Sequence, residues 1–179
     1  MTDTENGRGL VHIYCGDGKG KTTAAVGLAV RAAGSGMRVL FVQFLKDGTS
    51  SECTVLRTLP GVTVEGESPV RKFSFAMTGN EKTRCLAYNN TLLQHLQPLL
   101  EEENRLVVLD ECIGAIGAGL LDEAPLTALL QSPARRAEVV LTGRGPSAAL
   151  QACADYISEM RKVRHPYDRG IAARKGIEL

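Results

Sequence analysis

The stretch that most constrains the fold is GDGKGKTT, residues 16–23, which directly follows the apolar run 10–15. In a glycine-rich loop between a strand and a helix, successive backbone N–H groups form a concave site that binds phosphate. Cations in the same loop add attraction for the phosphate charge. Lys21 is expected to neutralise phosphate oxygens and the Thr22 hydroxyl to bind Mg²⁺. The other loop residues expected to bind the nucleotide are Gly16, Asp17, Gly18, Lys19, Gly20 and Thr23. The alternative is a solvated glycine–lysine turn.

The loop departs at one position from the pattern G-x-x-x-x-G-K-[ST]. The first glycine of that pattern falls at Cys15, and the glycine here stands one residue later, at Gly16. Gly16, Gly18 and Gly20 are expected to let the backbone approach the phosphates without a Cβ clash. The sequence therefore predicts a variant phosphate-binding loop.

Apolar runs of strand length alternate with helical patterns along the whole chain. Strands are expected at 10–15, 38–45, 62–65, 105–111, 137–142 and 156–163, and helices at 22–33, 81–103 (broken or kinked near Pro98), 120–131 and 147–154. Continuous apolar strands, as opposed to alternating ones, are typical of a parallel sheet covered on both faces. We expect a single-domain, three-layer α/β/α fold with a mainly parallel sheet, of the RecA-like P-loop NTPase class. Residues 1–9 would form a flexible tail and residues 10–179 the nucleotide-binding domain.

The amino-acid composition argues against some classes of binding partner. The 179 residues carry 21 Lys and Arg against 20 Asp and Glu, so no net field attracts nucleic acid or an anionic membrane. Aromatic residues make up 4% with no Trp, too few for a series of base-stacking platforms. Five cysteines without a CxxC pair predict reduced thiols in a cytoplasmic protein, and no apolar run is long enough for a signal peptide or membrane span.

Polar residues follow two further buried strands. Asp110 and Glu111 end the run LVVLDE, and the carboxyl edge of an open α/β sheet is where ligands bind. Either carboxylate is a candidate ligand for the metal, directly or through water. Arg144 stands between two glycines after the run VVLT, which suits a cation reaching a triphosphate or carboxylate, and equally suits a surface arginine in a tight turn.

Taken in order, these segments resemble the P-loop ATP:corrinoid adenosyltransferases. The resemblance spans residues 10–179, includes the loop without its first glycine, and is most specific in the final segment. The matching stretches are GDGKGKTTAAVGLAVRAAGSG, VLFVQFLK, VVLDE, VVLTGRGPS and ISEMRKVRHPYDRGIAARKGIE. In that final segment Glu159, Arg161, Asp168 and Gly170 match the family pattern, with a role in closing the sheet or in a dimer contact as the alternative to ligand contact.

The resemblance implies transfer of the 5′-deoxyadenosyl group of ATP, with Mg²⁺ or Mn²⁺, to the Co(I) centre of a corrinoid such as cobalamin or cob(I)yrinic acid a,c-diamide. Triphosphate is released, in adenosylcobalamin synthesis or salvage. The resemblance implies Lys21, Thr22, Glu111 and Arg144 as catalytic residues, and Thr22, Asp110 and Glu111 as metal ligands. No general base is needed, and His12 is expected to be a packing residue. A homodimer and a reductant partner such as a flavodoxin are also implied.

The resemblance also places aromatic side chains over the cobalt, and the matching segment RKFSFAMTG supplies Phe73 and Phe75. A short strand with both rings in the core is the alternative. Better-known family members carry Trp at the second position, and the family's longer members have an amino-terminal helical extension that covers the corrinoid. The segment after Glu111 is glycine-rich here. Three other functions compete with adenosyl transfer: a small-molecule kinase, an ATPase, and a carrier or regulator that binds adenosylated corrinoid with little turnover.

Overall fold

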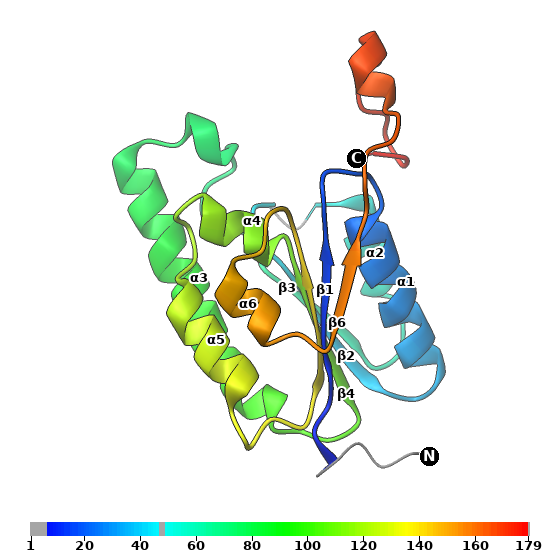
Figure 1. Cartoon of the computed structure of the whole chain (residues 1–179), viewed down its shortest axis with the longest axis vertical. Coiled ribbons are helices and arrows are strands. Elements are labelled where there is room, and N and C mark those ends of the chain that lie inside the picture. The colour runs from blue at the N-terminus through cyan, green and yellow to red at the C-terminus, as the bar shows by residue number, and fades with distance from the viewer. Residues whose placement is uncertain (1–6, 47–48, 179) are drawn as a thin grey trace.

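Six parallel strands form the sheet at the centre of the molecule (Figure 1). The computed structural model describes residues 7–46 and 49–178. The strands are β1 (Val11–Cys15), β2 (Arg38–Gln43), β3 (Val62–Glu65), β4 (Arg105–Asp110), β5 (Glu138–Thr142) and β6 (Tyr156–Glu159). Their order across the sheet is β3-β2-β4-β5-β1-β6. All pairs are parallel, so the carboxyl ends of the strands share one edge, and the predicted α/β class is confirmed.

The central strands are buried in the sheet because they carry apolar residues on both faces. In β2, β4 and β5 every residue after the first is buried, as expected for strands covered by helices on both sides. Because β5 lies between β1 and β4, its last residue, Thr142, stands between the phosphate loop and the end of β4. By contrast, β6 forms an edge of the sheet and all four of its residues are exposed.

Two helices cover one face of the sheet (Figure 1). Helix α1 (Lys21–Gly34) begins after Gly20, whose φ of 119° is a left-handed conformation that favours glycine. Its alanines 25, 29 and 32 pack on the sheet with Phe41. Helix α2 (Ser51–Leu56) is not among the helices expected from the sequence, and it buries Cys53 and Leu56 in the same core.

Four helices cover the other face, shown on the left of Figure 1. They are α3 (Gly79–Leu100), α4 (Cys112–Gly117), α5 (Glu123–Gln131) and α6 (Ala148–Ala152). A capping box starts α3: the Thr78 side chain accepts from the Glu81 N–H, and the Glu81 carboxylate accepts from the Thr78 N–H. The expected break at Pro98 is wrong, because α3 runs through this residue and ends two residues later. Pro98 removes one N–H donor from the last turn, and only two helical residues follow it.

The described segments before β1 and after β6 continue beyond the strands. The expected tail 1–9 falls largely on residues 1–6, which lie outside the described residues. Arg8 donates to the Leu130 carbonyl at 2.6 Å and the Gly9 N–H to the Arg136 carbonyl at 3.0 Å. After β6, a tail segment (residues 163–178) extends beyond the carboxyl edge and turns back towards it (Figure 1). No described helix is long and apolar enough to span a membrane.

Candidate nucleotide-binding site

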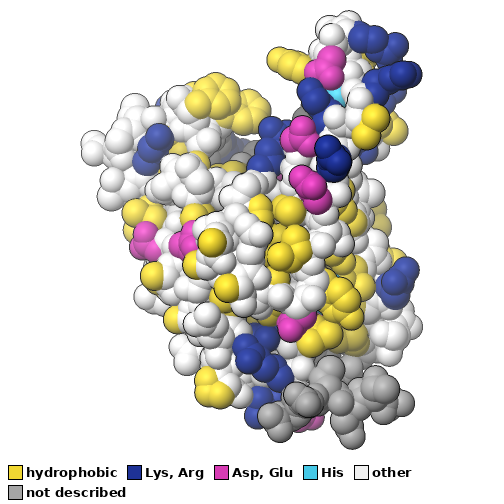
Figure 2. Space-filling view, viewed as in Figure 1, with side chains coloured by type: hydrophobic (Ala, Val, Ile, Leu, Met, Phe, Trp, Pro, Cys, Tyr) yellow, Lys and Arg dark blue, Asp and Glu magenta, His cyan; other side chains and the backbone are white. Residues whose placement is uncertain are grey.

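A cavity of about 1330 Å³ lies at the carboxyl edge of the sheet, where the sequence predicted the site. The phosphate loop and the start of α1 form its floor. Other parts of its wall come from the β2–α2 connection, residues 70–73 and the tail segment. Figure 2 shows the molecule hollowed between two projections, which Figure 1 identifies as the segment before α3 and the tail segment. The cavity lining contains seven Lys and Arg side chains against four Asp and Glu, which favours an anionic ligand.

Lys21 lies buried at the base of the phosphate loop. Its Nζ donates to the Gly18 carbonyl at 2.7 Å, so the ammonium is held inside the loop that the sequence predicted to bind phosphate. Burial lowers the pKa of Lys21, and the nearby positive charge of Arg144 lowers it further. A phosphate in this loop would neutralise both cations, so the pair is arranged for an anion.

The glycines of the loop are explained in part by the neighbouring strand. A Cβ on Gly16 would lie 2.4 Å from the Met160 carbonyl oxygen, and Gly16 has a φ of 105°. A Cβ on Gly18 would lie 2.7 Å from the same oxygen, to which the Gly18 N–H donates at 2.7 Å. The Lys162 N–H donates to the Asp17 carboxylate at 2.9 Å, which lowers the pKa of Asp17. Glycine is therefore required at 16 and 18 because the chain after β6 passes directly against the loop.

Asp110 is the centre of a buried polar network. Its carboxylate is fully buried, and Oδ1 accepts from the Thr22 hydroxyl and from the Thr142 hydroxyl, each at 2.8 Å. Gln43 donates to Oδ2 at 3.3 Å, and the Lys46 ammonium lies 3.8 Å from it. Residues from β2, β4, β5 and α1 thus converge on one carboxylate, and Asp110 and Thr22 meet as the sequence predicted.

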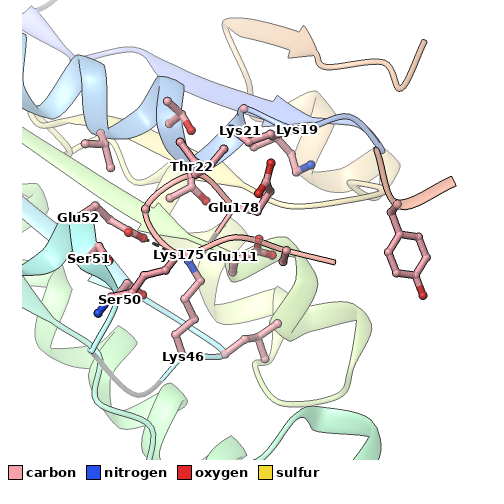
Figure 3. Close-up of a pocket in the computed structure, with 18 of the residues that line it drawn as sticks. Lys19, Lys21, Thr22, Lys46, Ser50, Ser51, Glu52, Glu111, Lys175 and Glu178 are labelled. Carbon is pink, nitrogen blue, oxygen red and sulfur yellow. Dashed lines mark hydrogen bonds and ion pairs between the residues drawn. The ribbon is translucent and has the colours of Figure 1, made fainter. Parts of the chain in front are cut away.

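Glu111 follows Asp110 but occupies a different position. Its φ of 60° is a left-handed conformation, and its N–H donates to the Thr142 hydroxyl at 2.8 Å. The turn separates the two carboxylates: Asp110 lies in the network under the loop, and Glu111 lines the cavity (Figure 3). Burial raises the pKa of Glu111, and the negative charge of Asp110 raises it further. A partly buried carboxylate with a raised pKa beside several cations is typical of a functional site.

The donor set of the site fits a magnesium ion bound together with phosphate. Mg²⁺ prefers oxygen ligands and is usually held by one or two protein groups, waters and substrate phosphates. Thr22 and Asp110 supply a hydroxyl and a carboxylate 2.8 Å apart beside the loop. Within 7–46 and 49–178 there is no cluster of three or more His, Cys, Asp or Glu that would hold a metal without such help.

The structure adds residues that the sequence analysis did not single out. Lys46, three residues after the end of β2, is 3.3 Å from the Glu52 carboxylate at the start of α2, and both line the cavity (Figure 3). Gln43, the last residue of β2, accepts from the Ser50 hydroxyl at 2.8 Å. Gln43 could have been predicted from the sequence, because it is a polar residue at the end of an apolar strand. Nothing in the sequence indicated that α2 would return Glu52 to this edge.

Arg144 and the two phenylalanines lie at different parts of the rim. Arg144 is exposed and lines the cavity above the loop, so it is available to a phosphate. Phe73 precedes a 3₁₀ turn (Ser74–Ala76) and Phe75 lies within it; the two side chains are 74% and 85% exposed and stack with ring centroids 5.5 Å apart. The alternative of a core strand is therefore wrong. Phe73 lines the cavity and Phe75 does not.

The fold and the site define a P-loop nucleotide-binding protein. A buried lysine in a glycine loop, a threonine bonded to a strand-end aspartate and a cationic cavity at the sheet edge are the parts of such a site. The model of the family "ATP:corrinoid adenosyltransferase BtuR/CobO/CobP" matches residues 7–179. The chain therefore belongs to this family, as the resemblance predicted.

Curated relatives match over nearly the whole chain. A "Corrinoid adenosyltransferase" of Pseudomonas aeruginosa is 34% identical over 96% of this chain and 84% of its own length. The "Corrinoid adenosyltransferase CobA" of Salmonella typhimurium is 32% identical and the "Corrinoid adenosyltransferase" of Escherichia coli K12 is 31% identical, each over 99% of this chain and 89% of its own length.

A solved structure supports the fold alone. The chain is similar to "EssC (ATPases 2 and 3)" from Geobacillus thermodenitrificans, with a TM-score of 0.52 and 16% identity. The match covers 96% of this chain and 35% of the other. It confirms the P-loop NTPase-like fold that the sequence predicted.

Proposed function

We propose that the protein transfers the 5′-deoxyadenosyl group of ATP to the Co(I) centre of a corrinoid and releases triphosphate. The observation that carries the proposal is a glycine loop with a buried Lys21, and a Thr22 bonded to Asp110, in a member of the corrinoid adenosyltransferase family. Family membership favours this function over a kinase, an ATPase or a carrier of adenosylated corrinoid, which share the loop but not the match over residues 7–179.

The transfer is a displacement at the ribose 5′-carbon. The electron pair of Co(I) forms the cobalt–carbon bond, the bond between C5′ and the ester oxygen breaks, and its electrons leave with the triphosphate. No proton is removed in this step, so the protein needs no general base. Its task is to orient ATP and to stabilise the charge that develops on the leaving triphosphate.

In this proposal, Lys21 and the backbone N–H groups of the loop bind the triphosphate, and Arg144 approaches it from the rim. Thr22 and Asp110 would hold Mg²⁺ or Mn²⁺, which supplies charge neutralisation of the phosphates. Glu111 faces the cavity next to this pair and completes the proposed catalytic set. Support comes from the 2.8 Å hydrogen bond between Thr22 and Asp110 and from the position of Glu111 in the cavity lining.

The corrinoid side of the proposal rests on Phe73 and Phe75. Two exposed, stacked rings beside the cavity are available to pack against a corrin face. Cobalamin and cob(I)yrinic acid a,c-diamide are the proposed acceptors, with a reductant protein such as a flavodoxin supplying electrons. Comparison of kcat/KM for the two acceptors would identify the preferred one.

A homodimer is the proposed assembly, and β6 is the element that supports it. This edge strand leaves Tyr156 and Ile157 about half exposed, and unpaired strand edges readily associate. Light scattering would give twice the monomer mass of 19.2 kDa. We also propose a cytoplasmic location, consistent with five free cysteines.

The experiment that tests the function mixes the protein with MgATP and chemically reduced cobalamin and identifies the phosphorus product by ³¹P NMR. Intact triphosphate, together with a light-sensitive cobalt–carbon product, is expected. ADP and phosphate formed without cobalamin would contradict the proposal and support a kinase or an ATPase. Lys21→Ala should abolish the reaction, whereas the exposed Lys82→Ala on α3 should leave it unchanged.

A further inference from the structure

We infer that Lys175 of the tail segment is a triphosphate-binding residue, and that an Arg174–Glu178 ion pair positions it. This inference rests on the proposed function and names a residue of the same site. It concerns a part of the chain distant in sequence from the phosphate loop, since about 140 residues separate the loop (16–23) from the tail segment (163–178).

The tail segment forms a wall of the nucleotide cavity. Seven of its residues after Gly170 line the cavity together with the phosphate loop: Ile171, Ala172, Ala173, Lys175, Gly176, Ile177 and Glu178. Lys175 and Glu178 lie on the ribbon that crosses in front of the loop, with Glu178 beside Lys19 and Lys21 and with Lys175 on the side of Lys46 and Ser50 (Figure 3). A triphosphate bound in the loop would therefore be enclosed by the tail segment.

The position of Lys175 is fixed by its neighbours. The Arg174 guanidinium contacts both Glu178 carboxylate oxygens, at 3.1 and 2.9 Å, and the Arg174 N–H donates to the same carboxylate at 3.0 Å. The Ile177 and Glu178 N–H groups donate to the Arg174 carbonyl. These bonds close one turn, residues 174–178, in which Glu178 lines the cavity with its charge paired to Arg174, and Lys175 lines the cavity as a cation.

The root of the tail segment is attached to the phosphate loop. Gly18 and Asp17 both hydrogen-bond to the chain directly after β6, and the Lys162 ammonium pairs with Asp168 at 3.0 Å. The orientation of the tail segment is thus linked to the loop that binds the phosphates. Within the described part of the chain, no carboxylate lies within 4.0 Å of the Lys175 ammonium, so its charge is available to a ligand.

The charge of the site supports a ligand with several negative charges. Lys21, Lys46 and Arg144 line the cavity from three separate segments of the chain. Lys175, from the tail segment, adds a fourth cation. Charge-assisted contacts of this kind are roughly twice as strong as neutral hydrogen bonds. Lys175 would therefore stabilise the triphosphate both in ATP and as the departing product.

The test is equilibrium binding of magnesium tripolyphosphate and of MgATP to the full chain by calorimetry. Lys175→Gln should raise the Kd for both about tenfold, as loss of one charge-assisted contact predicts. Lys175→Arg, which keeps the charge, should stay within about twofold of the wild type by the same reasoning. Arg169→Gln is the matched control, because Arg169 is an exposed cation of the same tail segment that does not line the cavity.

The positioning role is tested by a double-mutant cycle. Arg174→Gln should raise the Kd about threefold in the wild type and have no further effect in the Lys175→Gln background, since residues acting through one contact are not additive. An unchanged Kd in Lys175→Gln, or an equal rise in Arg169→Gln, would overturn the inference. These results are independent of turnover: failure of the wild type to release triphosphate refutes the proposed function, whereas unchanged binding in Lys175→Gln refutes only the role of Lys175.

Discussion

At the scale of single residues, neighbouring carboxylates have different roles because their backbones differ. Asp110 ends a strand and is fully buried under Thr22 and Thr142, where three side-chain donors and the Lys46 ammonium surround its carboxylate. Glu111 adopts a left-handed conformation that turns its side chain into the cavity. One carboxylate is therefore held in a fixed network, and the other remains close to the space where substrate would bind.

Glu111→Gln is expected to stabilise the protein at neutral pH and to slow adenosyl transfer. Burial and Asp110 raise the pKa of Glu111 in the folded state above its ordinary value, so the folded protein binds a proton more tightly than the unfolded chain. The free energy of unfolding should therefore fall as pH rises from the ordinary value through the raised pKa.

Urea unfolding at several pH values measures this effect. The fall attributed to Glu111 should be absent in Glu111→Gln, and the exposed Glu101→Gln should behave like the wild type. The assignment fails if the wild type and Glu111→Gln lose stability equally over that pH range.

At the scale of elements, the segment before α3 joins the rim of the cavity to the longest helix. The stacked phenylalanines stand on a 3₁₀ turn, and the capping box of α3 begins two residues after that turn. Lys72 adds an ion pair to Glu81 at 2.6 Å, which connects the phenylalanine segment to the first turn of the helix. The position of the rings thus depends on how α3 begins.

Thr78→Ala should destabilise the protein by about 0.5–2 kcal/mol, the usual effect of losing an N-cap side chain. The measurement is the free energy of urea unfolding. Thr83→Ala, which removes only a hydroxyl bonded within the exposed face of α3, should change it by less than about 0.5 kcal/mol. Equal losses in the two variants would show that the cap has no special role.

The capping box also predicts a dependence on acid. The hydrogen bond from Lys72 and the Thr78 N–H lower the pKa of Glu81 to about 2. Its stabilising effect should be complete above the ordinary Glu value and should disappear as pH falls towards 2. Circular dichroism of Glu81→Gln and the wild type should therefore give thermal midpoints that differ at neutral pH and converge in acid.

If the phenylalanine rings pack against the corrinoid as proposed, Phe75→Ala should leave ATP binding unchanged and should slow adenosylation that starts from Co(II). Phe75 lies outside the cavity lining, so its loss does not alter the phosphate site. Rates measured with chemically reduced Co(I) and with Co(II) plus a reductant separate the two steps. The same rate as the wild type from both states would place the corrinoid elsewhere.

At the scale of the whole molecule, chemistry and stability lie at opposite edges of the sheet. The nucleotide site occupies the carboxyl edge, whereas Arg135 is buried at the amino edge. There its guanidinium donates to the Leu130, Gly9 and Ala137 carbonyls at 2.9, 2.7 and 2.9 Å. The arginine ties the end of α5 to the residues before β1 and β5.

Arg135→Met should lower the free energy of unfolding by about 2–4 kcal/mol, because it leaves buried carbonyls without donors. The Kd for MgATP of the folded variant should stay within about twofold of the wild type, since no cavity residue is touched. Urea unfolding and calorimetry measure the two quantities. A large rise in Kd without loss of stability is the result that would contradict this separation.

The amino-acid sequence alone determined the parallel α/β fold, the phosphate loop with Lys21 and Thr22, and the place of Asp110, Glu111 and Arg144 after buried strands. These follow from local patterns, because apolar runs and glycine turns report their own conformation. Tertiary structure decided the rest. Helix α2, the roles of Gly16 and Gly18 against Met160, the exposure of Phe73 and Phe75, and the return of Lys175 to the cavity each depend on contacts between segments far apart in the chain. Such contacts leave no local pattern, so only the folded arrangement of β6, α2 and the tail segment could establish them.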